Sequence, residues 1–184
     1  IAYIGINNHE IDLIAPFIEA LKCENVKNSY RLILYGNTIS NEKWNQLGLS
    51  EIAEYRGWLD YSKDVSTLKD IDVFLQLLDD NNVSKAGWPN KLGDYLAFGK
   101  PVILSPYGDI IDFVKNEKGF FIVEYNKYSI LKILQEIKDI PYSDLKTMGY
   151  ANRQLAEKIS WKNRAKNIEY ICNKIRFNNE TVKN

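Results

Sequence analysis

Short apolar runs alternate along the chain with stretches in which apolar residues recur at helical spacing. The runs have the length of single strands, and the spaced stretches have the period of helices that bury one face. We predict strands at Ile1–Ile6, Arg31–Tyr35, Ile52–Arg56, Val73–Leu77, Val102–Leu104 and Phe120–Val123. We predict helices at Ile11–Leu21, Asn41–Leu47, Ser62–Lys69, Asn90–Phe98, Gly108–Val114, Lys127–Ile137, Asp144–Ile159 and Lys162–Ile175. This alternation is typical of βαβ units, so we expect an α/β fold with a doubly wound parallel sheet of about six strands and helices on both faces.

Residues suited to caps and turns set the ends of these elements. Ser62 is suited to the N-cap of its helix, and Gly99 to a left-handed C-cap before the next strand. We predict a long polar loop over Leu78–Pro89 and a polar, frayed and disordered tail over 177–184. No internal repeat or low-complexity linker is present, so we expect one domain over residues 1–176.

The predicted topology indicates where a ligand would bind. In a doubly wound sheet the site lies at the carboxyl ends of the strands, near the point where the strand order reverses. Four predicted loops lie at that edge, namely 5–10, 57–61, 78–90 and 105–108.

The charge balance and the cysteines exclude several functions for this chain. Twenty-four Lys and Arg residues balance 24 Asp and Glu residues, so the chain has no basic footprint for nucleic acid and no polybasic run for anionic lipid. Cys23 and Cys172 belong to no metal or redox motif, and we expect two reduced thiols in a cytoplasmic protein. The chain opens at Ile1 inside an apolar run, and we expect it to be a piece of a larger protein.

Residues 87–102 are the stretch that is most informative about function. Pro89 suits the first turn of a helix, because its missing N–H is not needed there. The helix start at Asn90 offers free N–H groups and a positive dipole end, both of which attract phosphate, and Lys91 adds a full charge. Asp94 follows Lys91 on the same predicted helix face, and its carboxylate is able to accept hydrogen bonds from a ribose diol. A solvated surface pair between Lys91 and Asp94 is the alternative.

This stretch resembles the donor-site helix of family 4 glycosyltransferases of the GT-B fold, whose pattern reads approximately Pro-Asn-Lys-Leu-x-Glu-Tyr-x-Ala-x-Gly-Lys-Pro-Val. The matching residues here are Asn90, Lys91, Leu92, Tyr95, Ala97, Gly99, Lys100, Pro101 and Val102. Asp94 stands where the family has the Glu that binds the ribose, so the resemblance assigns it that role. The resemblance spans about residues 1–175 and includes Tyr35-Gly36, Gly57-Trp58-Leu59, Ser105, Gly108, Asp112, Val114, Gly119 and Trp161.

The resemblance implies a Rossmann-like domain that forms the C-terminal half of a GT-B enzyme. It also implies retaining, metal-independent transfer of a sugar from a nucleoside diphosphate sugar, without a cofactor. Lys91 is then the catalytic residue that stabilises the departing diphosphate. The donor-binding residues are Asp94, Asn90, Pro89, Trp58, Leu59, Lys85, Ser105, Gly108, Gly5, Asn7, Asn8 and His9. A missing N-terminal domain would hold the acceptor and make any peripheral membrane contact, and the isolated domain would transfer little or no sugar.

The loop after the first strand departs from the family pattern. The family commonly places an Arg and a Lys there to neutralise the diphosphate, and residues 5–10 have no such pair. His9 or the amides of Asn7 and Asn8 are candidate replacements. A solvated loop near a helix N-cap is the alternative for these residues.

Two further positions leave other functions open. Ala86 stands where many members have an acidic residue that contacts the sugar, and Lys85 is either the basic residue that precedes the motif or a solvated lysine. A degenerate, non-catalytic nucleotide-binding or interaction module therefore remains an alternative, as does a GT-B sugar-nucleotide epimerase. Asp70-Ile71-Asp72 is formally a metal motif of another glycosyltransferase fold, but it lies at the wrong end of its strand, where capping and solvation are expected.

Overall fold

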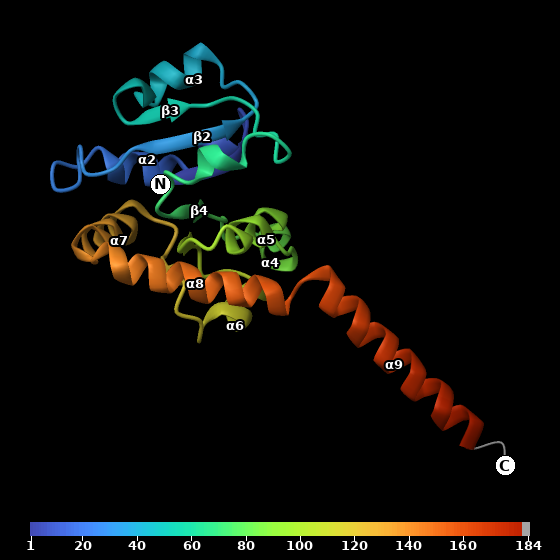
Figure 1. The fold of residues 1–184 in the computed structure, drawn as a ribbon. Helices are drawn as coiled ribbons and strands as arrows, with labels where there is room; N and C mark the ends of the chain where they lie inside the picture. Colours follow the sequence, from blue (N-terminus) through green and yellow to red (C-terminus); the bar gives the residue numbers. More distant parts are fainter. Residues whose placement is uncertain (182–184) are drawn as a thin grey trace.

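The computed structural model describes the backbone of residues 1–181 and the side chains of residues 1–175. Its strands form one parallel sheet in the order β3-β2-β1-β4-β5-β6 (Figure 1). The strands are β1 Ala2–Ile6, β2 Leu32–Gly36, β3 Ala53–Tyr55, β4 Phe74–Gln76, β5 Val102–Leu104 and β6 Phe120–Ile122. The predicted doubly wound parallel sheet is confirmed, and each strand lies within its predicted run or extends it by one residue.

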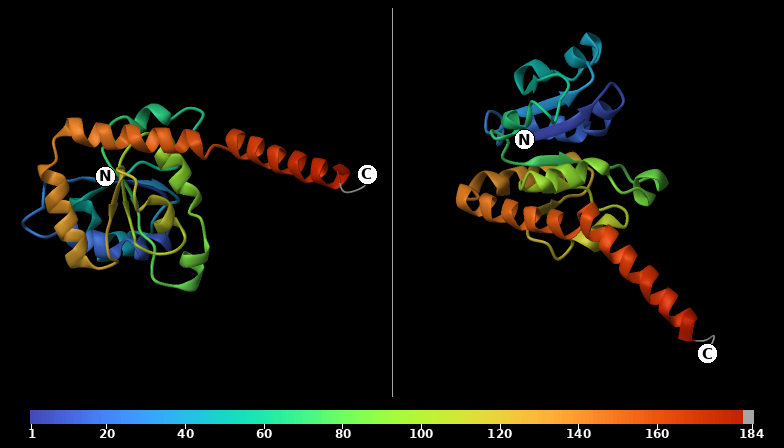
Figure 2. Two further views of the ribbon diagram at one scale, coloured as in Figure 1. Left: turned by 90° about the horizontal axis from the view of Figure 1, so that it is seen from below. Right: turned by 45° about the vertical axis from the view of Figure 1, so that its right-hand side comes forward.

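Two layers of helices cover this sheet, one on each face (Figure 2). One layer contains α1 Glu10–Leu13, α2 Ala15–Leu21, α3 Asn41–Gln46, the 3₁₀ turn η1 Leu49–Glu51 and α7 Lys127–Asp139. The other contains the 3₁₀ turn η2 Val65–Leu68, α5 Asn90–Ala97, α6 Ile110–Val114 and α8 Tyr142–Lys158. Because both faces are covered, the central strands are apolar at consecutive positions.

Alternate strand residues enter the two halves of the core. Tyr3 and Leu34 belong to the core on the face covered by α2 and α7, whereas Ile4 and Tyr35 belong to the core on the face covered by η2, α5 and α8. This division follows from the two-residue period of a strand. The sheet thus holds α5 on one face with its N-terminus at the carboxyl edge.

The order of the strands reverses between β1 and β4. The chain runs outward from β1 through β2 and β3, and then returns to lay β4 along the other side of β1. The connections that leave β1 and β4 therefore diverge and open a crevice at the carboxyl edge. The loop at residues 7–9 and the start of α5 meet there.

The structure corrects several of the predicted helices and loops. The predicted loop Leu78–Pro89 contains α4, Asn82–Ala86, because Asn81 Oδ1 accepts a hydrogen bond from the Ser84 N–H and caps it. The predicted helix from Ser62 is only the short turn η2, and Ser62 does not cap it. The predicted helix Ile11–Leu21 is divided at Ile14, where Pro16 lacks the N–H that would continue the first segment.

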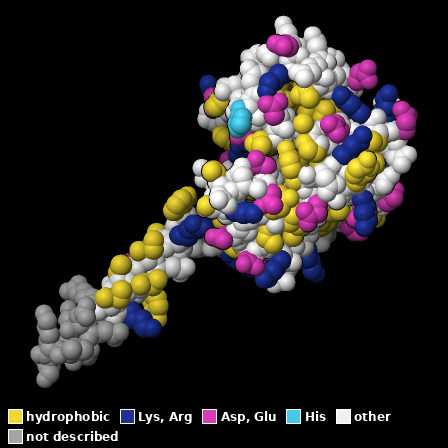
Figure 3. Space-filling model, turned by 180° about the vertical axis from the view of Figure 1, so that it is seen from behind, with side chains coloured by type: hydrophobic (Ala, Val, Ile, Leu, Met, Phe, Trp, Pro, Cys, Tyr) yellow, Lys and Arg dark blue, Asp and Glu magenta, His cyan; other side chains and the backbone are white. Residues whose placement is uncertain are grey.

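The last helix, α9 Trp161–Thr181, extends away from the body of the domain (Figures 1 and 3). Within the tail predicted over 177–184, the backbone is helical over 177–181, and 182–184 lie outside the described residues. Apolar side chains of α9 are exposed, among them Trp161, Ile168, Ile171 and Ile175. None of the helices in the described part of the chain is both long and apolar enough to cross a membrane.

Candidate functional site

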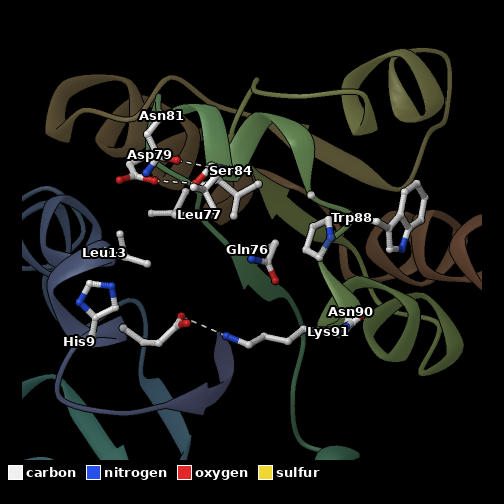
Figure 4. A pocket seen from close by; sticks show the side chains of 15 residues that line it. His9, Leu13, Gln76, Leu77, Asp79, Asn81, Ser84, Trp88, Asn90 and Lys91 are labelled. Atoms are coloured by element: carbon white, nitrogen blue, oxygen red, sulfur yellow. Dashed lines mark hydrogen bonds and ion pairs between the residues drawn. The ribbon is translucent and has the colours of Figure 1, made fainter.

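A cavity of about 490 Å³ opens at the carboxyl edge, between the ends of β1 and β4. Its walls come from the loop after β1, the end of β4, α4 and the start of α5 (Figure 4). Of the predicted site residues, it brings together His9, Pro89, Asn90 and Lys91. The rule for doubly wound sheets therefore places the cavity correctly from topology alone.

Lys91 crosses from α5 to the loop after β1. Its Nζ donates to the Tyr3 hydroxyl at 2.9 Å and to Glu10 Oε2 at 3.0 Å. The side chain passes over Gly5, where an added Cβ would lie 2.9 Å from Lys91 Cε. Gly5 also has a φ of +85°, which side chains rarely adopt. Both the backbone conformation and the path of Lys91 therefore favour glycine at position 5.

Tyr3 and Glu10 both accept hydrogen bonds from the Lys91 ammonium. The Tyr3 side chain is buried, and burial together with the adjacent Glu10 carboxylate raises the pKa of its hydroxyl well above the ordinary value. Tyr3 therefore stays neutral, and its hydroxyl donates a hydrogen bond to Glu10 Oε2. Glu10 balances the charge of Lys91, so an incoming anion has to compete with this carboxylate.

Asp94 faces a second cavity. The Tyr61 hydroxyl donates a hydrogen bond to Asp94 Oδ2 at 3.0 Å. Asp94 lines a cavity of about 380 Å³ together with Trp161 and Arg164. The predicted alternative, an ion pair with Lys91, is not among the pairs of the described residues. The two side chains of α5 thus enter adjoining cavities rather than one, because Lys91 bends toward β1 while the short Asp94 stays near Tyr61. Asn90 and Trp88 line both cavities.

The three polar residues after β1 differ in their roles. Asn7 Oδ1 accepts hydrogen bonds from the N–H groups of His9 and Glu10, at 2.8 and 2.9 Å, and so stabilises the start of α1. Asn8 Oδ1 accepts from the Ser40 N–H at 2.9 Å and ties this loop to the start of α3. The alternative is a solvated loop with Asn8 or His9 near a helix N-cap; His9 is the N-cap residue of α1, and its side chain makes no capping hydrogen bond. His9 alone of the three lines the cavity.

Ser105, Gly108 and Lys85 shape the walls and are not lining residues of this cavity. Ser105 is fully buried, and its Oγ accepts from the Leu78 N–H at 2.8 Å, which joins the segments after β4 and β5. Gly108 has a φ of +81°, and a Cβ there would meet the Lys85 carbonyl oxygen at 2.7 Å. Lys85 forms an exposed ion pair with Asp80.

Trp58 and Leu59 are predicted site residues that line neither cavity. Trp58 is 71% exposed, whereas Leu59 is buried in the core beneath α5. In this segment Trp58 is therefore exposed to solvent, and Leu59 packs in the core.

At the opposite edge of the sheet, Asp70 forms an ion pair with Arg56 at 2.9 Å, which agrees with the structural role expected for it.

Gln76, which is not among the predicted site residues, lines the cavity at the end of β4. Its side chain is only 3% exposed, and its Oε1 has no hydrogen-bond partner among the described residues. The available signal was a single polar residue in the apolar run Val73–Leu77, at the carboxyl end where ligands bind. Beside it, Ser84 donates to Asp79 Oδ1 at 2.6 Å, and this hydrogen bond lowers the pKa of Asp79.

Solved structures similar to this chain are glycosyltransferases. A sucrose-phosphate synthase from Thermosynechococcus elongatus superposes with a TM-score of 0.72 and 14% identity, over 95% of this chain and 45% of that one. Anabaena Alr3699/HepE in complex with UDP gives 0.62 and 16%, over 85% and 43%. The C-terminal domain of the group 1 glycosyl transferase LpcC from Francisella tularensis gives 0.62 and 15%, over 86% and 83%.

These superpositions show a fold shared with the C-terminal domains of GT-B glycosyltransferases. The chain spans less than half the length of the sucrose-phosphate synthase and HepE chains. No curated protein matches it in sequence. A family model described as Glycosyl transferases group 1 matches residues 1–139, and the chain therefore belongs to the group 1 glycosyl transferases.

Proposed function

We propose that this chain binds a nucleoside diphosphate sugar and forms the donor half of a retaining, metal-independent glycosyltransferase. The observation that carries the proposal is the position of Lys91. Its ammonium lies at the carboxyl edge of the sheet, beside the N-terminus of α5 and above Gly5, whose missing side chain leaves room for Lys91. A positive charge next to a helix N-terminus is an arrangement that binds phosphate.

Each part of the donor has a proposed partner. The diphosphate would lie against Lys91 and the free N–H groups at Asn90, which stabilise the charge that grows on it as the sugar departs. The ribose would bind Asp94, and the backbone at Trp58 and Leu59 would contact the base. HepE has been solved in complex with UDP and with UDP-glucose, which makes UDP a suitable first probe for this chain.

Glu10 gives this site a feature of its own. In the unliganded arrangement its carboxylate already neutralises Lys91, so diphosphate binding would draw Lys91 Nζ away from Glu10. The free energy of diphosphate binding is then the difference between the ion pair that Lys91 forms with the diphosphate and the one that it gives up with Glu10. We therefore expect the affinity of the isolated chain for the diphosphate to be weak. Removing the carboxylate with Glu10→Gln should strengthen UDP binding, because Lys91 would lose its competing partner.

The rest of the enzyme is also part of the proposal. A preceding domain would hold the acceptor and close over the donor, and any peripheral membrane contact would be made by that domain. The whole enzyme would work in the cytoplasm and need no cofactor beyond its donor substrate. The 184-residue chain by itself should bind nucleotide and transfer little or no sugar.

Calorimetric titration of the chain with UDP, ADP and GDP tests the proposal. We expect one of them to bind, and we expect Lys91→Ala and Asp94→Ala each to weaken that binding about tenfold, or about 1.4 kcal/mol. Lys132→Ala is the matched control, because Lys132 is an exposed lysine of α7 that pairs only with Glu136 among the described residues. The 2′-deoxy form of the same nucleotide should lose affinity for the parent chain, and much less for Asp94→Ala.

The same titration addresses the second candidate function. The pairing of Lys91 with Glu10, together with Ala86, favours a binding or interaction module that no longer holds a donor. Absence of binding of all three nucleotides at millimolar concentration would refute the donor site and leave this module as the conclusion. Binding that is equal in the parent, Lys91→Ala and Asp94→Ala would refute the assignment of the residues.

A further inference from the structure

We infer that Gln76 binds a hydroxyl group of the transferred sugar and so helps to select the donor. The inference rests on the proposed function and adds a residue to it. Gln76 ends β4 at the bottom of the cavity, and Figure 4 shows it between the Lys91–Glu10 pair and the Ser84–Asp79 pair.

The unpartnered amide oxygen points to a ligand. Gln76 is 97% buried, and no donor among the described residues reaches its Oε1. Leaving a buried polar atom without a partner is destabilising, and most such atoms in folded proteins are paired. The neighbouring strand positions are apolar, and an apolar residue would pack there without this loss. A bound group that donates a hydrogen bond accounts for the presence of glutamine.

The chemistry of the wall identifies that group as a hydroxyl. An ionised phosphate has no hydrogen to donate, so it does not satisfy a carbonyl oxygen. The charged side chains of the cavity are the carboxylates of Glu10 and Asp79 and the ammonium of Lys91. The Lys91 end, beside the N-terminus of α5, attracts an anion, whereas the carboxylates of Glu10 and Asp79 repel an anion and accept hydrogen bonds. A sugar ring beyond the diphosphate brings several hydroxyls to such a wall.

Lys91 and Gln76 are therefore expected to recognise different parts of one ligand. Lys91 contacts the diphosphate, which the bare nucleotide also contains. Gln76 contacts the transferred sugar, which the nucleoside diphosphate lacks. A variant at position 76 should thus affect the sugar nucleotide alone.

The test compares a bare nucleotide with its sugar nucleotides. The nucleoside diphosphate that binds the parent chain is titrated beside its glucose, galactose, mannose and N-acetylglucosamine conjugates. We expect at least one conjugate to bind more tightly than the bare nucleotide. In Gln76→Met, which keeps the length of the side chain, that conjugate should bind about tenfold more weakly while the bare nucleotide binds within about twofold of the parent.

Controls separate this inference from the proposed function and from misfolding. Lys91→Ala should weaken the bare nucleotide and its conjugate alike. The melting temperature of unliganded Gln76→Met should equal or exceed that of the parent, because the unpartnered oxygen is gone, and Gln76→Leu should repeat the binding result. Equal weakening of both ligands in Gln76→Met, or no conjugate that binds better than the bare nucleotide, overturns the inference while the donor site stands. Failure of every nucleotide to bind rejects both.

Discussion

Replacement of Gly5 by alanine tests whether the path of Lys91 across the first loop matters. The added Cβ would lie 2.9 Å from Lys91 Cε and 3.4 Å from its Nζ, so the end of this flexible side chain has to move. The backbone φ of +85° adds a strain of about 1–2 kcal/mol for alanine, which is offset by about 0.4–1 kcal/mol because the unfolded chain loses freedom. We expect Gly5→Ala to lower the free energy of unfolding by about 1 kcal/mol.

The larger effect of Gly5→Ala should be on binding. Displacing Lys91 from its path over Gly5 moves its ammonium away from the proposed position of the diphosphate, and the charge-assisted hydrogen bond that it would donate there is worth about 1.5–3 kcal/mol. UDP affinity should therefore fall about ten- to a hundredfold. Calorimetry measures the affinity, and urea unfolding followed by circular dichroism measures the stability.

Gly48→Ala is the matched control for this substitution. Gly48 also has a left-handed φ, of +55°, and its added Cβ would meet the exposed end of a different lysine, Lys22 Nζ, at 3.0 Å. It should lose a similar amount of stability and keep the affinity for UDP. If Gly5→Ala and Gly48→Ala bind UDP equally well, the route of Lys91 over Gly5 has no part in binding and our reasoning is refuted.

Three other predictions concern stability. Asn152 is buried and donates to two backbone carbonyls at 2.8 Å, so Asn152→Ala should lower the free energy of unfolding in urea by about 1–3 kcal/mol, and an unchanged midpoint would contradict this. Arg56 lowers the pKa of Asp70, so this pair stabilises the fold above about pH 4 and loses its effect as the pH falls through the lowered pKa; by urea unfolding, Asp70→Asn should be slightly less stable than the parent at pH 7, and this difference should shrink as the pH is lowered. Gly93 lies inside α5 with open space where a Cβ would be added, so Gly93→Ala should raise the melting temperature by the equivalent of about 0.5–1 kcal/mol, and a lower melting temperature would argue against the helix.

The spacing of apolar residues and the residues at helix ends made most of the fold predictable from the sequence. The strands and the long helices follow from hydrophobic spacing, and Gly99 adopts the left-handed C-cap that its place before a strand predicts, with a φ of +65°. The errors over the body of the domain fall on short elements. α4 depends on a single cap from Asn81, and the division of the first helix depends on Pro16, so a short helix is set by one side chain rather than by a repeated pattern.

The sequence by itself also determined that Lys91 stands in the first turn of a helix at the carboxyl edge of a parallel sheet, because spacing and topology are properties of the chain order. Only the tertiary structure decided what surrounds that lysine. Gly5, Tyr3 and Glu10 come from the first strand and the turn after it, and their contact with Lys91 exists because β1 and β4 are neighbours. The isolation of the Gln76 oxygen likewise depends on every atom packed around it, and a local pattern does not contain that information.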